Sequence, residues 1–496
     1  MVSSAMKSGL LMGFGSVGVV VGAVMLVYWP SIFFAQLRRM MILTETSTSF
    51  GIWREIPIPM YLECYMFNIT NVEEILAGKA AKISVQEVGP YVYRETHTKV
   101  DIEWNDNSTV TFYNERYWYY EPEMSNGSLS DLITSVNPIV VTIGHFMRHN
   151  HPILNIPVDA FLKMFHEHMF VTANVSKWMF DGIDDPVLTV IKTRFPKLPI
   201  DIPYDKFGWF YDRNGSKEFD GRFLMNTGAS EFSNLGNVEK WKYSNRTLYR
   251  DECGEVRGST GELWAPELGQ QEITIFAPDI CTYMTLAKNS SVRIDGIDGV
   301  MYVANRSVFD NGYNYPKMAC YCDEVRDRDC VPPGALNVSA CRLGAPAFVS
   351  RPHFLYMDPH YPGKIDGLRP TEDMNFRLSL EMYTGMPLNV AAQLQINLLV
   401  RHVPAMTLNN RLPDGDTLVP MFWFRQEVRV TDRYARLARF ALGLRSGMPY
   451  GFYVLTAIGV VLIMASIWIL MKKLLRSPET SPILQNSSQE NISDER

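Results

Sequence analysis

The chain has 496 residues, of which 47% are hydrophobic and 20% are charged, and its formal net charge is −6. This length allows roughly two to four domains, or one large domain. The acidic balance argues against a nucleic-acid-binding protein, because such a protein presents a strongly basic face to its phosphate partners.

The first predicted element is a membrane-spanning helix at residues 9–28, preceded by a short cytoplasmic N-terminus, residues 1–8. The segment carries no charged side chain, and about 20 such residues suffice to cross the hydrocarbon core of a bilayer. A cleaved signal peptide is the alternative. The apolar run is longer than usual for such a peptide and no clear cleavage pattern follows it, so the sequence favours an uncleaved signal-anchor.

Glycines recur at a spacing of four within this segment. Gly9 with Gly13, and Gly18 with Gly22, form two small-xxx-small pairs, a pattern that lets helices approach one another closely. The partner is either the second predicted span or a second copy of the chain, so the pattern allows a homo-oligomer. The alternative is that glycine is simply common in membrane helices.

Most of the long segment that follows, residues 29–449, has the pattern of β-strands. Residues 81–122 alternate apolar and polar side chains, with turn signals at Gly89-Pro90 and at Asn105–Ser108. Residues 393–403 and 419–430 repeat the alternation later in the chain. We therefore expect a large sheet structure between the two ends of the chain.

One stretch, residues 137–181, differs and predicts a small helical cluster. Asn137-Pro138 has the form of a helix cap followed by proline at the first helical position. A shorter helix is expected near Asn174. The apolar residues that recur at helical spacing and predict one stripe of a helix are Val158, Phe161, Leu162, Phe165 and Met169.

Nine sequons in residues 29–449 predict a glycosylated surface that faces the lumen or the cell exterior. Each has the form Asn-x-Ser/Thr without proline at x, which is the acceptor pattern for N-linked glycans. The predicted glycosylation sites are Asn68, Asn107, Asn126, Asn174, Asn214, Asn245, Asn289, Asn305 and Asn337.

Six cysteines fall within residues 253–341, and the oxidising lumen favours disulfides over free thiols there. Six cysteines allow 15 pairings, which the spacing alone does not resolve. Zinc binding is the alternative, but a C-x-C followed by single cysteines is unlike the usual ligand spacing. Cys64 is left over and is expected to be a buried thiol. The six are Cys253, Cys281, Cys320, Cys322, Cys330 and Cys341.

A second membrane-spanning helix is predicted at residues 450–471. Three basic residues follow within residues 472–476, so the tail, residues 472–496, should be cytoplasmic, and two spans place the N-terminus there too. The tail contains an approximate acidic dileucine sorting signal formed by Glu479, Ile483 and Leu484. Such a signal would direct the protein to endosomes and lysosomes.

The two-span plan also occurs in ecto-nucleotidases and in some ion channels. The segment between the two spans contains no glycine-rich phosphate loop of the kind that a nucleotidase needs. Neither span carries the charged residues that usually line an ion pore. No constellation of acid, base and nucleophile stands out, so we expect no enzyme activity and no cofactor.

These features together resemble the class B scavenger receptors. Three stretches carry the likeness: "VQEVGPYVYRE" at residues 85–95, the six-cysteine pattern with its C-x-C, and the long segment at residues 351–400 that begins "RPHFLYMDPHYPG". With the two terminal spans, the resemblance covers essentially the whole chain.

The resemblance implies a mainly β fold with α, in which a large antiparallel β-barrel-like ectodomain is crossed by a lipid tunnel and carries an apical helical bundle. It implies a plasma-membrane receptor that binds and transfers lipids or lipoproteins and mediates uptake of particles that carry them. The alternative is an endosomal or lysosomal sorting receptor for a protein cargo, acting in a pH-dependent way. The disulfides that the resemblance implies are Cys253–Cys320, Cys281–Cys341 and Cys322–Cys330.

The apical region departs from the family, because His166, Glu167 and His168 stand where a relative carries a lysine pair. Histidine titrates near endosomal pH, so one hypothesis is a pH-sensitive apex that binds a ligand in one compartment and releases it in another. The alternative is an ordinary solvated surface. Lys163 and Lys177 are further candidates, since each could bind an anionic lipid head group.

Overall fold

The computed structural model describes residues 4–194, 204–266, 270–322, 330–413 and 415–475. The chain divides into two compact units. The two ends of the chain, residues 1–37 and 437–496, form one unit, which we call the helix pair. Residues 38–436 form the other, which we call the large unit.

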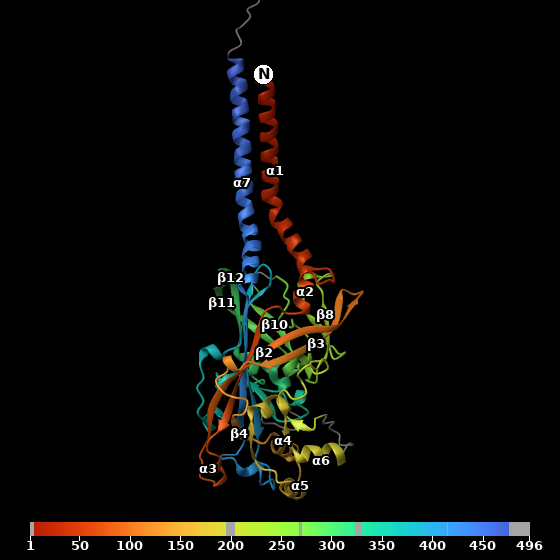
Figure 1. Ribbon diagram of the computed structural model, residues 1–496, viewed down its shortest axis with the longest axis vertical. Helices are drawn as coiled ribbons and strands as arrows, with labels where there is room; N and C mark the ends of the chain where they lie inside the picture. The colour runs from red at the N-terminus through yellow and green to blue at the C-terminus, as the bar shows by residue number, and fades with distance from the viewer. Residues whose placement is uncertain (1–3, 195–203, 267–269, 323–329, 414, 476–496) are drawn as a thin grey trace, which may run out of the picture. The chain divides into compact units, whose positions relative to one another are not determined.

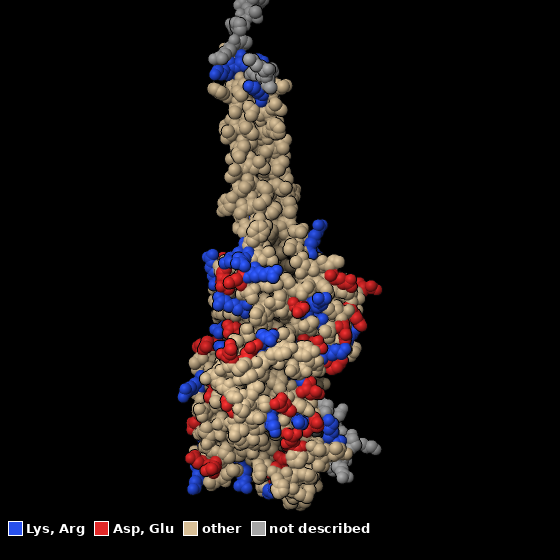
Figure 2. Space-filling view, viewed as in Figure 1, with Lys and Arg blue, Asp and Glu red and all other residues tan. Residues whose placement is uncertain are grey.

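The helix pair contains most of α1 (Ser4–Met41) and most of α7 (Asp432–Leu474). Both helices are long and apolar enough to cross a membrane, by length and composition. The predicted spans at residues 9–28 and 450–471 lie inside these helices. Both helices extend beyond the apolar runs from which the spans were predicted. Figure 2 shows a continuous stretch of the pair without any Lys, Arg, Asp or Glu.

The two helices run antiparallel and in close contact. The hydroxyl groups of Ser8 and Ser466 lie 2.8 Å apart at one level, and the rings of Trp29 and Phe452 meet at another, with centroids 5.6 Å apart. A Cβ atom at Gly15 would come within 2.8 Å of the carbonyl oxygen of Gly459, so only glycine fits this crossing.

The predicted glycine pairs have different surroundings. Gly22 lies against Thr456 and Gly18 against Leu455, so this pair packs on the second span of the same chain. A Cβ atom at Gly9 or Gly13 would meet nothing within 4 Å. The homo-oligomer expected from the first span therefore stays a prediction, with Gly9 and Gly13 as the pair left uncovered in one chain.

A mixed sheet of 14 strands, antiparallel but for one short pairing, forms the frame of the large unit. The main path of paired strands is β10 (Glu272–Ala277), β11 (Thr282–Ile294), β12 (Ile297–Ala304), β16 (Arg377–Glu381), β17 (Pro387–Val400), β18 (Thr417–Arg429), β1 (Met60–Ile69), β2 (Ile83–Asn105), β3 (Thr109–Tyr120), β8 (Arg222–Asn226) and β9 (Val238–Trp241). Off this path lie β13 (Ala335–Asn337), β14 (Ala347–Ser350) and β15 (Ile365–Asp366).

The two ends of this path nearly meet, so the sheet is almost closed. The amide of Val238 in β9 donates to the carbonyl of Gly258 at 2.8 Å. The amide of Phe276 in β10 donates to the carbonyl of Ser259, also at 2.8 Å. The short segment 258–259 thus joins the two edge strands, which removes most of the unpaired edge that an open sheet would expose. The expected β-barrel-like architecture is confirmed.

The alternation in residues 81–122 is confirmed as a hairpin of β2 and β3, with the turn at Asn105–Ser108 where it was predicted. The predicted turn at Gly89-Pro90 is wrong, because β2 continues through it. There the pairing with β1 shifts by one residue at Cys64/Met66. Gly89 has φ +123°, and a Cβ atom on it would lie 2.7 Å from the carbonyl oxygen of Cys64, so glycine is required by this bulge.

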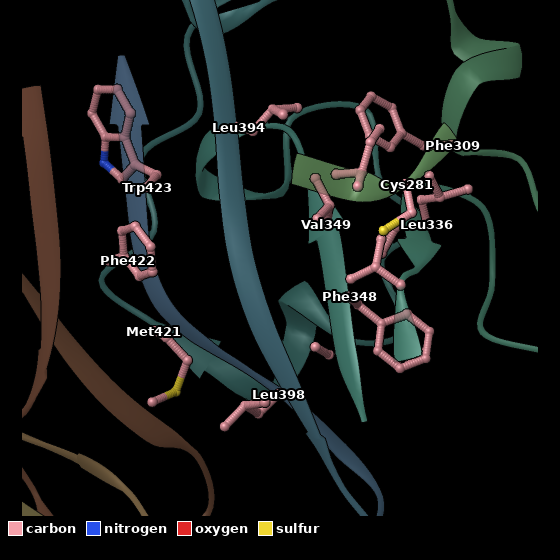
Figure 3. Close-up of a cluster of buried hydrophobic side chains, with 14 of the residues drawn as sticks. Cys281, Phe309, Leu336, Phe348, Val349, Leu394, Leu398, Met421, Phe422 and Trp423 are labelled. Carbon is pink, nitrogen blue, oxygen red and sulfur yellow. The ribbon is translucent and has the colours of Figure 1, made fainter. Parts of the chain in front are cut away.

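A cluster of buried hydrophobic side chains lies where β14, β17 and β18 meet (Figure 3). All residues of β18 from Thr417 to Trp423 are buried, because this part of the strand is covered on both faces. The labelled side chains in Figure 3 that come from these three strands are Phe348, Val349, Leu394, Leu398, Met421, Phe422 and Trp423.

A buried ion network lies inside the large unit. Arg213 Nη2 lies 2.6 Å from an Asp279 carboxylate oxygen and 3.1 Å from one of Asp220. Arg116 Nε reaches the other oxygen of Asp220 at 2.8 Å. Burial would raise the pKa of Asp279, but Arg213 and Arg116 outweigh it and hold that pKa at about 2. This network could not be predicted from the sequence, because Arg116 and Asp279 lie far along the chain from Arg213 and Asp220.

The helices of the large unit gather mainly at one end of the barrel. In Figure 1, α3 (Val72–Leu76), α4 (Pro138–Met147), α5 (Pro152–Met164) and α6 (Pro186–Arg194) lie at this end, whereas α2 (Thr48–Arg54) lies at the other. Two small sheets accompany them: β4 (Leu132–Val136) with β5 (Phe170–Asn174), and β6 (Ile183–Asp184) with β7 (Lys206–Phe207).

Candidate functional site: the helical cluster

The predicted helical cluster exists, but its internal boundaries differ from the prediction. Asn137 caps α4 as expected, since its Oδ1 accepts from the amides of Ile139 and Val140. The helix expected near Asn174 is a single turn at Lys177–Asp181, preceded by the strand β5. A further helix, α6, extends the cluster beyond residue 181.

The predicted apolar stripe does not form one helix through Met169, because α5 ends at Met164. His166 has φ +59°, the left-handed conformation. Its amide donates to the Lys163 carbonyl, and the next amide, of Glu167, donates to the Leu162 carbonyl. This is a Schellman motif, which ends helices and usually places glycine at the left-handed position. A histidine there gave no recognisable stop signal in the sequence.

The helix α5 is turned so that polar side chains face inward. Asn155 and Asp159 are buried. The Asn155 amide donates to the carbonyl of Pro404 at 2.9 Å. The Asp159 carboxylate accepts from the backbone amide and the hydroxyl of Thr407, at 2.9 Å each. Buried polar groups are tolerated when they are hydrogen-bonded in this way.

The same orientation leaves aliphatic side chains of α5 in solvent. Ile153 is 67% exposed, Leu154 58%, Ile156 57% and Met164 66%. We call these four residues the α5 patch. In Figure 2 the surface at the tip where α5 lies carries few charged atoms. A group of exposed apolar side chains on one helix marks an interaction site more often than a single exposed leucine does.

The two lysines predicted to bind ligands already have carboxylate partners. Lys163 Nζ lies 2.7 Å from Asp159, one turn away on α5. Lys177 Nζ lies 3.8 Å from Asp184. Each lysine is about half exposed, so each could still meet an anionic group from solvent, but the geometry does not bring the two together with His166 and His168 into one pocket.

In the stretch that departs from the family, the buried residue is the acid rather than the histidines. His166 and His168 are both exposed, whereas Glu167 between them is only 7% exposed. Exposed and buried side chains alternate here because the chain has left α5 and is extended toward β5. The hypothesis of histidine-based pH sensing therefore applies to surface side chains and stays a prediction.

Glu167 lies in an acidic and apolar setting. Its carboxylate accepts from the Asn137 side-chain amide at 2.7 Å. Burial, and then the nearby Asp185, raise the pKa of Glu167 to about 7. Burial also raises the pKa of Asp185, although Asp185 accepts from the amide of Leu188 at the start of α6. The sequence reasoning missed this acidic pair, because an acid between two histidines usually faces solvent.

The structure pairs the six cysteines as the resemblance implies: Cys253 with Cys320, Cys281 with Cys341, and Cys322 with Cys330. The Cα atoms of the three pairs lie 5.9, 5.8 and 5.6 Å apart, within the range of disulfides. Cys64 is a free, buried cysteine. Burial raises the pKa of its thiol, which makes it an unreactive core residue.

None of the nine predicted glycosylation sites is buried. The acceptors that are exposed are Asn107, Asn126, Asn214, Asn245 and Asn289, and those that are partly exposed are Asn68, Asn174, Asn305 and Asn337. Attachment of glycans stays a prediction. The sorting signal of Glu479, Ile483 and Leu484 lies outside the described residues.

The chain resembles known proteins over nearly its whole length. A family model described as the CD36 family matches residues 13–470. The chain is 33% identical over 417 residues to Protein peste of Drosophila melanogaster, which covers 82% of this chain and 72% of that protein.

Two further relatives carry different names. The chain is 32% identical over 468 residues to Scavenger receptor class B member 1 of Sus scrofa, covering 93% of this chain and 89% of that protein. It is 29% identical over 452 residues to Lysosome membrane protein 2 of Homo sapiens, covering 88% of both. With the nearly closed sheet and the two apolar terminal helices, these matches show that the chain belongs to the CD36 family of class B scavenger receptors.

Proposed function

We propose that this protein is a receptor that binds lipid-bearing particles through the helical cluster and transfers lipid from them. The single observation that carries the proposal is the α5 patch, in which aliphatic side chains are held in solvent by a helix whose polar side chains are buried. A surface of lipid head groups and acyl chains is a partner that such a patch can enter. The proposal includes neither catalysis nor a cofactor.

The chemistry of the patch favours a lipid surface over a small polar ligand. Each buried CH₂ group contributes roughly 0.8 kcal/mol to transfer out of water. The exposed cations at Lys163 and Lys177 border the cluster and could contact anionic head groups. A tunnel through the barrel, which the family resemblance implies, would then keep the transferred acyl chain away from water, and it forms part of this proposal.

The test of docking is a charge placed in the patch. Leu154→Asp should reduce binding of fluorescent phospholipid-coated particles to cells that display the full chain by roughly tenfold, because a buried charge would oppose contact with lipid. The matched control is Leu248→Asp, since Leu248 is 71% exposed on another part of the large unit. Equal binding by the two variants at equal surface expression would contradict docking through α5.

The test of transfer is the lipid content of the protein itself. Native mass spectra of the full chain in detergent, before and after lipid extraction, should show bound lipids of defined mass that leave on extraction. A folded, disulfide-intact protein that never carries lipid would contradict lipid transfer, and would favour the second candidate function below.

The second candidate is a sorting receptor that binds a protein cargo in a pH-dependent way. The observation that favours it is Glu167, which lies buried in the cluster with its pKa raised to about 7. A group that changes charge between neutral and acidic compartments can alter the conformation of the cluster when the receptor moves from one to the other. In this case cargo binding should change between pH 7.4 and pH 5, and Glu167→Gln should remove much of the change.

For either candidate we propose a chain that crosses the membrane twice, with residues 1–8 and 472–496 in the cytoplasm and the large unit outside or in the lumen. Plasma membrane is the proposed residence for the lipid receptor, and the endosomal or lysosomal membrane for the sorting receptor. Protease treatment of sealed vesicles whose cytoplasmic side faces outward, with epitope tags at both termini, tests this topology. Both tags should be cleaved while the large unit stays protected, and protection of either tag would contradict it.

A further inference from the structure

The outer face of β3 carries two exposed tyrosines that have no role in the helical cluster. Tyr117 is 38% exposed and Tyr119 is 46% exposed. Their ring centroids are 6.5 Å apart and the ring planes differ by only 19°, so the two rings lie nearly parallel to one another. We call them the tyrosine platform. Exposed aromatic rings in contact with one another are common at binding surfaces.

A cation fixes one end of the platform. The Arg94 guanidinium lies 4.9 Å from the centroid of the Tyr119 ring, and its Nε lies 2.8 Å from the carboxylate of Glu121. The ion pair of Arg94 and Glu121 therefore holds the Tyr119 ring in place. Trp118, between the two tyrosines, points to the opposite face and is only 6% exposed, as the alternation of a strand requires.

One of the predicted sequons lies along the edge of β3 beside this platform. The amide of Gly215 donates to the carbonyl of Arg116 at 2.8 Å. The amide of Trp118 donates to Oδ1 of Asn214 at 3.0 Å. The pairing of β8 with β3 covers only Thr109–Tyr113, so the sequon loop takes the place of a strand beyond that point.

These two hydrogen bonds determine how the sequon meets the platform. A Cβ atom on Gly215 would lie 2.8 Å from the ring of Tyr117, so the middle residue of the sequon lies directly against that ring. Gly215 also has φ +74°, which favours glycine for a second reason. Asn214 is exposed, and its Nδ2 makes no hydrogen bond to any residue that the structure describes, whereas its Oδ1 is held by Trp118.

We propose that Asn214 is glycosylated and that the first sugars of its glycan pack on the tyrosine platform. The Nδ2 atom is the one to which the first N-acetylglucosamine is attached, and the next residue of the sequon, Gly215, lies against the ring of Tyr117. A pyranose ring has an apolar face of C–H groups that suits the electron-rich face of an aromatic ring. Because the sugar is tethered, even a weak contact is formed for much of the time.

The consequence is that this flank of the barrel is covered and does not serve as a ligand-docking face. Without the glycan, two neighbouring tyrosines with adjacent arginine would form the kind of surface that commonly contributes most to protein–protein binding. The glycan would therefore direct partners away from β3.

The experiment measures the chemical accessibility of the two rings in the full chain, purified from cells that attach unprocessed high-mannose glycans. Tyrosine nitration by tetranitromethane is followed peptide by peptide for three forms: fully glycosylated, trimmed to one N-acetylglucosamine, and fully deglycosylated. We expect Asn214 to be occupied, and Tyr117 and Tyr119 to react roughly two- to tenfold more slowly in the first two forms than in the third.

Tyr315 is the internal control, because its 46% exposure equals that of Tyr119, and its rate should not change. Asn289→Gln removes another exposed sequon, located on β11, which does not pair with β3, and should leave the protection intact. Asn214→Gln should abolish it. The enzymatic series answers the question on the wild-type chain even if that variant folds poorly.

Three results would overturn the inference. Equal nitration rates in all three forms would show that the sugars do not cover the platform. Protection that survives Asn214→Gln would assign the cover to something else. An unoccupied Asn214 beside an occupied Asn289 would refute this inference alone, whereas the absence of glycan at every sequon would refute the proposed topology as well.

Discussion

Replacing Glu167 by glutamine should stabilise the helical cluster at neutral pH and leave it unchanged in acid. Glu167 is buried, accepts a hydrogen bond from Asn137 and lies near the carboxyl group of Asp185. Glutamine keeps an oxygen that can accept from Asn137 but carries no charge at any pH. The variant therefore resembles the protonated form of the wild-type side chain.

The expected magnitude follows from the pKa. Burial and Asp185 raise the pKa of Glu167 from its ordinary value of 4.5 to about 7, and each unit is worth about 1.4 kcal/mol, which gives an upper limit of roughly 3 kcal/mol. Partial access of solvent to the site reduces this to roughly 1–2 kcal/mol. The change is large enough to be measured, since whole domains are stable by only about 5–15 kcal/mol.

The sign follows from proton binding. Below pH 4.5 the carboxyl group is protonated in both the folded and the unfolded chain and has no effect on stability. Between pH 4.5 and 7 the unfolded chain releases its proton first, so the folded cluster holds more protons and its stability falls as the pH rises. Above pH 7 the folded carboxylate carries the full cost. Wild-type and variant should thus agree at pH 4 and diverge toward pH 7.5.

Hydrogen exchange of the α4 amides measures the local stability in the full chain reconstituted in lipid nanodiscs, after correction for the intrinsic effect of pH on exchange. Protection factors in Glu167→Gln should exceed those of wild type roughly 5- to 30-fold at pH 7.5, for 1–2 kcal/mol. Glu123→Gln, at an exposed glutamate, is the matched control and should change nothing. Protection that falls in Glu167→Gln at pH 7.5, or that keeps the wild-type pH dependence, would refute the reasoning.

Two further predictions concern the frame rather than the site. Arg213→Met removes the cation that joins the buried carboxylate of Asp220 to the partly exposed carboxylate of Asp279, while Arg116 stays beside Asp220. The free energy of unfolding of the large unit should therefore fall, by at most roughly 3–5 kcal/mol; a loss under 1 kcal/mol in denaturant titrations would show that the network is replaceable. Gly22→Leu places a side chain against Thr456 and should force α1 and α7 apart. The yield of crosslinking between cysteines introduced into the two helices should therefore fall. Gly9→Leu is the control, because a Cβ atom there meets nothing within 4 Å, and it should leave the yield unchanged.

The parts of the fold that local patterns encode could be predicted from the sequence. The hairpin of β2 and β3 follows from alternation of apolar and polar residues around a polar turn, and the start of α4 follows from Asn137-Pro138. The disulfide pairing came from the family resemblance and not from spacing, since the cysteines alone allow 15 pairings.

The orientation of α5 could not be predicted, because its causes are distant in sequence. Asn155 and Asp159 are buried through partners 249 and 248 residues away, at Pro404 and Thr407. Periodicity alone assigns apolar residues to the core and polar residues to solvent. It gives no reason to bury Asp159, and it extended the helix past the left-handed His166. In this helix tertiary hydrogen bonds override the pattern.

Because only a few apolar side chains of α5 are exposed, the α5 patch can bind only weakly by itself. Covering Ile153, Leu154 and Ile156, which are each more than half exposed, would contribute at most roughly 1.5–3 kcal/mol per side chain, or about 5–9 kcal/mol in all. Association of two free molecules costs about 4–15 kcal/mol in lost freedom and ordering. One patch therefore binds a single soluble ligand weakly.

A particle whose surface offers many equivalent contacts changes this balance, because once one receptor holds it, each further contact becomes intramolecular. Binding that rises steeply with the density of the receptor on a membrane, and that is weak for the same lipid presented as a monomer, is the behaviour that this geometry predicts. Binding that is independent of receptor density would instead require a deeper site than α5 provides.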